Sequence, residues 1–159
     1  MKKVAILYSE YSPLVDAIKY QLSDYEVDCF TMLENLEKYD LIVQANFQGE
    51  FSGNSIKCHH SLLPSFNTKD PEKEAILAGV KVTGITVYYT NPEKIITQYP
   101  IFINSETHYD DLKRELSYLE QTIFPLIIKK ILNNEWFEIQ SLLNKGCGNF
   151  CGGCSQCNH

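Results

Sequence analysis

The chain has 159 residues, 44% of them hydrophobic, which is typical of a single soluble globular domain. At this length a protein buries roughly 70% of its unfolded surface, so the core needs no disulfide bonds. The formal net charge of −6 argues against nucleic acid or an anionic membrane surface as the main partner. The first apolar run, Val4 to Tyr8, is too short for a membrane span or a signal-peptide core, so we expect a cytoplasmic protein.

The first third of the chain alternates between strand-like and helix-like segments. Helical spacing of apolar residues from Leu14 to Leu22 predicts one helix, and a second short helix is expected from Met32 to Tyr39. The runs with strand character are residues 4–8, 27–31 and 40–45. This alternation predicts an α/β fold with a mostly parallel sheet flanked by helices.

The next segments have clear boundary signals. A helix is expected from Pro71 to Ala78, with Asp70 as its N-cap and Gly79 closing it. Residues 82–89 and 95–103 are rich in β-branched and aromatic side chains and predict neighbouring strands joined by a hairpin turn.

A long helix is expected after Thr107, which can cap it together with Asp110. Pro125 lies inside this helix and should kink it. The apolar face is predicted at helical spacing: Leu112, Leu116, Leu119, Ile123, Ile127 and Ile131.

One segment carries a resemblance to a known family. Ser61 to Phe66, with the sequence SLLPSF, resembles the active-site segment of the formyltransferase family, which includes glycinamide ribonucleotide formyltransferase and the methionyl-tRNA formyltransferase catalytic domain. Gly84 to Tyr88 resembles a later strand of that family, and Glu120 with Phe124 and Pro125 resembles its final helix. The resemblance covers about residues 56–137 and implies a Rossmann-like domain over residues 1–138.

This resemblance implies a reaction, formyl transfer, and a set of catalytic residues. Members of the family transfer a formyl group from a reduced folate to an amine with an asparagine, a histidine and an aspartate. His59 falls on the histidine position and Lys57 on the asparagine position, while Glu93 is the acid able to stand in for the aspartate. His59, Lys57 and Glu93 are therefore the implied catalytic residues. The residues implied to bind the substrate or a tetrahydrofolate derivative are His60, Ser61, Leu62, Leu63 and Pro64.

Two residues of this segment have structural alternatives. His60 replaces the proline that is usual in the family, and hydrogen bonding to the backbone of the SLLP loop explains it equally well. Cys58 alternates with His59 on a buried strand, so we expect a small core residue rather than a reactive thiol.

The last part of the chain, residues 139–159, is cysteine-rich and is predicted to form a separate metal-binding tail. Four of the six cysteines fall within it, at Cys147, Cys151, Cys154 and Cys157. Clustered thiols in a chain without a signal peptide favour a metal over disulfides. Four thiolates suit tetrahedral zinc or an iron–sulfur cluster, and a flexible thiol tail for redox or metal delivery is the alternative.

Three function classes follow from the sequence. The first is one-carbon transfer with a rearranged site and an amine acceptor. The second is a degenerate formyltransferase scaffold that uses the metal of the tail for another reaction. The third is a non-enzymatic binding or regulatory module that senses a folate, a metal or the redox state. In each class the expected partner is a small molecule, and a protein partner or a homo-oligomer is possible.

Overall fold

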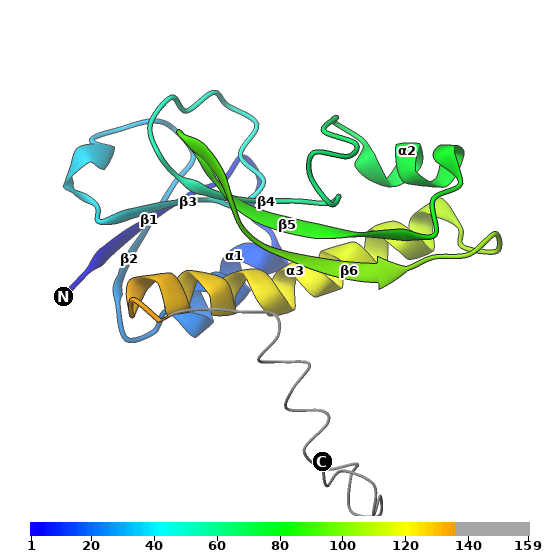
Figure 1. Ribbon diagram of the computed structural model, residues 1–159. Coiled ribbons are helices and arrows are strands. Elements are labelled where there is room, and N and C mark those ends of the chain that lie inside the picture. The colour runs from blue at the N-terminus through cyan, green and yellow to red at the C-terminus, as the bar shows by residue number, and fades with distance from the viewer. Residues whose placement is uncertain (136–159) are drawn as a thin grey trace, which may run out of the picture.

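The computed structural model describes residues 1–135, which form one six-stranded sheet with helices packed on it (Figure 1). The elements, in chain order, are β1 (Lys3–Leu7), α1 (Pro13–Gln21), β2 (Glu26–Phe30), the 3₁₀ helix η1 (Leu36–Lys38), β3 (Leu41–Gln44), β4 (Ile56–His59), α2 (Pro71–Ala78), β5 (Val82–Thr90), β6 (Glu93–Phe102) and α3 (Tyr109–Leu132). The strand order is β2-β1-β3-β4-β5-β6. The first four of these strands are parallel, and β5 and β6 are antiparallel, so the predicted α/β fold with a mostly parallel sheet is confirmed.

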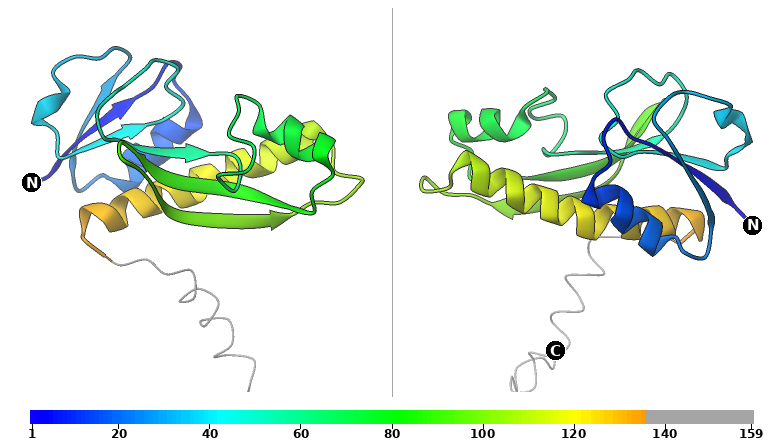
Figure 2. Two further views of the ribbon diagram at one scale, coloured as in Figure 1. Left: turned by 45° about the horizontal axis from the view of Figure 1, so that its top comes forward. Right: turned by 180° about the vertical axis from the view of Figure 1, so that it is seen from behind.

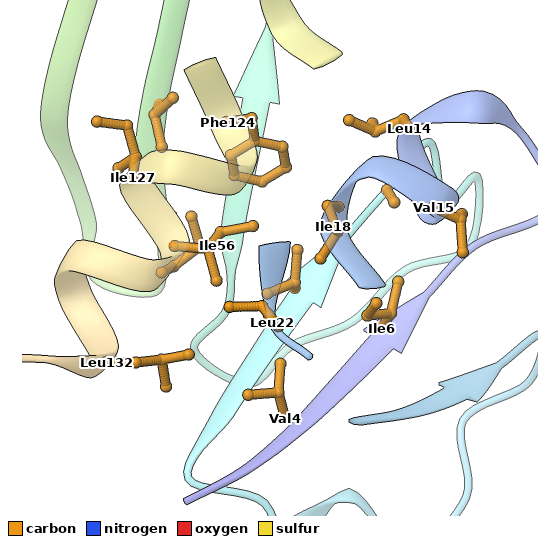
Figure 3. Close-up of a cluster of buried hydrophobic side chains, with 14 residues drawn as sticks. Val4, Ile6, Leu14, Val15, Ile18, Leu22, Ile56, Phe124, Ile127 and Leu132 are labelled. Atoms are coloured by element: carbon orange, nitrogen blue, oxygen red, sulfur yellow. The ribbon is translucent and has the colours of Figure 1, made fainter. Parts of the chain in front are cut away.

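The main core lies between one face of the sheet and the helices α1 and α3, which Figure 2 shows side by side from behind. Val4 and Ile6 of β1 point into this layer and Ile18 comes from α1, while Phe124 comes from α3 (Figure 3). All four side chains are completely buried. The alternate residues of β1, Ala5 and Leu7, pack on the opposite face with residues of the connecting loops, so β1 is apolar on both sides, as parallel strands are.

Helix α2 begins and ends where the sequence predicts. The Asp70 carboxylate accepts a hydrogen bond from the Lys73 backbone N–H, and Gly79 takes the left-handed conformation at the end of the helix. The predicted hairpin between β5 and β6 is also confirmed, with Thr90 paired to Glu93. The helix expected from Met32 to Tyr39 is wrong in extent, because only η1 forms. Asn35 is left-handed, with φ of 42°, which interrupts a right-handed helix before Leu36.

Helix α3 differs from the prediction at its start and along its face. His108, not Thr107, is the N-cap, because the Thr107 hydroxyl hydrogen-bonds Asn104 instead. The helix continues through Pro125 to Leu132. Its buried residues include Glu120 and Phe124, whereas the predicted Leu119 and Ile123 are only partly buried.

None of the helices in residues 1–135 is both long and apolar enough to cross a membrane. The predicted division of the chain at residue 138 lies beyond the described part, as do Cys147, Cys151, Cys154 and Cys157, so the separate tail stays a prediction.

Candidate functional site

The site lies at the carboxyl end of β4, where the parallel part of the sheet meets the antiparallel hairpin. Lys57 and His59 alternate with Cys58 along this strand, so they share one face of the sheet while Cys58 packs on the core side beneath. Lys57 and His59 border a hollow of about 200 Å³. Its other lining residues are Asn46, Cys58, His60, Thr68, Lys69, Pro71, Glu72 and Glu120. The structure therefore brings together the lysine and the histidine that the sequence analysis singled out.

The ring of His59 is held by the loop that follows it. Its Nε2 atom lies 3.0 Å from the carbonyl oxygen of Phe66. A carbonyl only accepts hydrogen bonds, so Nε2 carries the proton and Nδ1 keeps its lone pair in the neutral ring. Within residues 1–135 no hydrogen bond to Nδ1 is found, and the ring is partly exposed. The Phe66 carbonyl thus selects the tautomer of the neutral His59 ring, and the Nδ1 lone pair is available to accept a proton.

His60 is bound by two glutamates. Its Nδ1 atom lies 2.6 Å from Glu72 Oε1 on α2, and its Nε2 atom lies 2.7 Å from Glu120 Oε2 on α3. Both carboxylates are nearly buried, at 8% and 6% side-chain exposure. We call His60, Glu72 and Glu120 the charge triad. The sequence-based alternative for His60, a hydrogen bond to the loop backbone, is wrong, and it is His59 that makes such a bond.

The charge triad keeps His60 protonated at neutral pH. Burial alone would lower the pKa of His60, but the hydrogen bonds that its ring N–H groups donate to Glu120 and Glu72 outweigh burial and raise that pKa to about 9. For Glu72, burial opposes ionisation, but the hydrogen bond with His60 prevails and lowers the pKa of this carboxyl. His60 is therefore an imidazolium that joins β4, α2 and α3. Both of its ring nitrogens are already hydrogen-bonded, so a contact with a ligand would have to use the ring carbons.

Cys58 sits beneath the charge triad and is not poised to react. Burial, with the nearby Glu120 carboxylate as a second cause, raises the pKa of the Cys58 thiol well above its ordinary value. A thiol of raised pKa is a poor nucleophile and a poor metal ligand near neutral pH. This agrees with the prediction of a small core residue.

The SLLP loop is fixed mainly by Thr86 of β5. The Thr86 hydroxyl donates to the carbonyl of Ser61 at 2.6 Å and accepts from the backbone N–H of Leu63 at 3.0 Å. The side-chain amide of Gln98 on β6 also bonds this hydroxyl and the carbonyl of Leu63. Ser61 and Leu63 are buried, whereas Leu62 and Pro64 are at least partly exposed. Ser61 and Leu63 therefore anchor the loop, and the role predicted for them in ligand binding stays a prediction.

Glu93 lies at the start of β6 and borders a second hollow, of about 620 Å³. The other lining residues of this hollow are Gln44, Gly49, Glu50, Phe51, Ser52, Lys57, Tyr88 and Thr90. Lys57 lines both hollows, but His59 borders only the first and Glu93 only the second. Of the three predicted catalytic residues, Lys57 thus borders both hollows, and Glu93 and His59 each border one of them.

Sequence reasoning missed the two acids of the charge triad. Glu120 had a detectable signal, because it stands four residues from both Leu116 and Phe124 and interrupts the buried face of α3 with a charge. Glu72 had no such signal, because acidic residues are common in the first turn of a helix, where they interact favourably with the helix dipole. Within residues 1–135 no group of three histidine, cysteine or acidic side chains has the arrangement of a metal site.

The fold and this site define a member of the formyl transferase family. The sequence pattern of that family, described as formyl transferase, matches residues 6–128, and the chain belongs to it. Phosphoribosylglycinamide formyltransferase of Bacillus subtilis (strain 168) is 33% identical over 132 residues, covering 79% of this chain and 64% of that protein. Formyltetrahydrofolate deformylase 2, mitochondrial, of Arabidopsis thaliana is 31% identical over 106 residues, covering 65% of this chain and 32% of that protein. The chain therefore spans less than two thirds of these curated relatives.

Solved structures show the same fold. Phosphoribosylglycinamide formyltransferase from Bacillus halodurans superimposes with a TM-score of 0.67 at 21% identity, covering 86% of this chain and all of that one. A formyltetrahydrofolate deformylase from Pseudomonas syringae gives a TM-score of 0.65 at 19% identity, covering 76% of this chain and 58% of that one. The likeness to both establishes the Rossmann-like formyltransferase fold.

Proposed function

We propose that this protein removes the formyl group from a reduced formyl folate and transfers it to an amine, with the reaction centred on Lys57 and His59. The observation that carries the proposal is the placement of Lys57 between two hollows, with His59 lining one of them. A group-transfer enzyme needs such an arrangement, because donor and acceptor must approach one another from two sides of the transferred group.

The larger hollow suits the formyl donor. Its volume, about 620 Å³, falls in the ordinary range for sites that bind small organic molecules. Phe51 and Tyr88 offer aromatic surfaces for a flat ring, and the carboxylates of Glu50 and Glu93 can accept from ring N–H groups. The smaller hollow, lined by His59, then receives the acceptor. With the donor in the larger hollow, Glu93 binds the donor. It does not take part in the proton transfer in which the aspartate of the family acts.

The chemistry divides between two side chains. The Lys57 ammonium stabilises the negative charge that develops on the formyl oxygen when the acceptor nitrogen attacks the formyl carbon. The His59 Nδ1 atom takes the proton that the acceptor nitrogen must lose. The bond from the formyl carbon to the folate nitrogen then breaks, that nitrogen regains a proton, and the products are a formylated amine and tetrahydrofolate. With water as acceptor, the same steps give formate, as the names of the deformylase relatives indicate.

The test is to incubate the purified full-length chain with 10-formyltetrahydrofolate and to measure tetrahydrofolate and formate. One arm contains phosphoribosylglycinamide, one a simple primary amine, and one no acceptor. Tetrahydrofolate that forms only with an amine supports transfer, and tetrahydrofolate formed with equal formate and no amine supports hydrolysis. No consumption of the donor in any arm would contradict the proposed function.

We also propose that Cys147, Cys151, Cys154 and Cys157, which lie outside the described residues, bind zinc or an iron–sulfur cluster. Protein purified without oxygen is expected to contain about one zinc, or about four irons with a broad absorption band near 400 nm. Replacing Cys151 and Cys154 by serine should abolish the bound metal. Since Cys29 and Cys58 belong to the folded domain, their conversion to serine is the matched control and should leave the metal content unchanged.

A further inference from the structure

Asn46 follows β3 after one intervening residue, Ala45, and β3 is the strand next to β4. The two strands are parallel, with Val43 paired to Ile56 and Gln44 to Lys57. Asn46 stands two residues beyond Gln44, and His59 stands two residues beyond Lys57, so both lie at the same edge of the sheet. Asn46 also borders the hollow that contains Lys57 and His59, together with an adjoining hollow of about 530 Å³.

The backbone presents the Asn46 side chain to this hollow from a fixed position. The residues on either side, Ala45 and Phe47, are buried, while Asn46 itself is exposed. The backbone N–H of Ala45 is bonded to the carbonyl of Leu7, which keeps the chain on the sheet up to this point. Asn46 then takes the left-handed conformation, with φ of 59°, and this turns the chain away from the strand direction.

The side-chain amide of Asn46 makes no hydrogen bond within residues 1–135. By contrast, His59, His60, Glu72 and Glu120, which also line this hollow, each have a hydrogen-bond partner. An amide N–H₂ group is a neutral donor of two hydrogen bonds, which is the kind of group that stabilises a developing oxyanion. The family position for such an asparagine is occupied here by Lys57.

We infer that Asn46 is a catalytic residue whose side-chain amide donates a hydrogen bond to the formyl oxygen, so that an asparagine from the loop after β3 acts where the family uses one from β4. This inference rests on the proposed function. As the acceptor nitrogen adds to the formyl carbon, the carbonyl electron pair moves onto oxygen, and the Asn46 N–H₂ and the Lys57 ammonium both point hydrogen atoms at it. When the carbon–nitrogen bond of the donor breaks, the carbonyl re-forms, and Asn46 is left unchanged.

Asn46→Gly separates this role from a purely structural one. Glycine accepts the left-handed backbone, so the variant should fold and unfold at the wild-type temperature, and only the amide is lost. We expect kcat for release of the formyl group to fall about 100-fold, with the KM for 10-formyltetrahydrofolate changed by less than about threefold. Asn46→Asp, which keeps the shape and replaces the donor by a negative charge, should be at least as impaired.

Asn35→Gly is the matched control, because Asn35 is also left-handed, with φ of 42°, and lines neither hollow of the site. It should have the wild-type rate. An active wild type with an equally active Asn46→Gly variant would overturn this inference and leave the proposed function standing. A wild type that consumes no formyl donor would overturn both.

Discussion

Between pH 6 and pH 10 the free energy of unfolding is expected to fall by about 3 kcal/mol because His60 loses its proton. The pKa of His60 is about 9 in the folded protein and about 6.5 in an unfolded chain, so folding is favoured by proton binding. The stabilisation is complete below about pH 6.5 and is lost as the pH rises through about 9. Denaturant titrations at several pH values measure this slope, and the imidazole resonances of His60 should titrate with a midpoint near 9.

The thiols of Cys29 and Cys58 also have raised pKa values, so they add to the loss of stability at the upper end of this range. His60→Gln isolates the histidine, because both thiols remain. Its stability should be lower than that of the wild type at pH 6 and should change less between pH 6 and pH 9. Curves of equal slope for the two proteins would show that the charge triad does not hold a proton in solution.

Replacing His59 by asparagine is expected to lower the rate of formyl release by about 10² to 10⁴-fold. The change removes the Nδ1 lone pair that would accept the proton of the incoming amine, while the asparagine amide can still reach toward the Phe66 carbonyl. The KM for the formyl donor should change little, because His59 does not line the hollow assigned to it. Steady-state kinetics with 10-formyltetrahydrofolate measure both parameters.

The matched control is His108→Asn. His108 is exposed, caps α3 without a side-chain hydrogen bond, and lines neither hollow of the site, so this variant should keep the wild-type rate. If His59→Asn keeps more than about a third of the wild-type rate, proton transfer by His59 is excluded.

The sequence allowed the sheet and the position of the site to be predicted, since both follow from local patterns. The parallel strands alternate with helix signals, and the segment SLLPSF marks the end of β4. The face of α3 was only partly predictable, because the position of its buried stripe drifts along a helix of 24 residues and depends on where the helix begins. The shift of the N-cap from Thr107 to His108 arises from a competing bond to Asn104.

The hydrogen bonds of His60 to Glu72 and Glu120 could not be predicted from the sequence. His60, Glu72 and Glu120 are separated by 12 and 60 positions, and only the folded chain brings them within hydrogen-bond distance. The same holds for Asn46, which approaches His59 through the pairing of two strands rather than through spacing along one. A sequence motif identifies functional residues that are close together in the chain. The charge triad and Asn46 involve residues from different secondary-structure elements, which a motif does not identify.

The charge triad also limits how this protein can diverge. Removing His60 leaves Glu72 and Glu120 buried as two like charges without a counter-charge, and leaving a buried charge without its partner costs about 3 to 5 kcal/mol. That is a large share of the stability of a small domain. Descendants of this chain that keep both acids should therefore keep His60 as well, and the effects of substitutions at the three positions should be far from additive. A histidine at position 60 in a related sequence therefore predicts an acid at position 72 or at position 120.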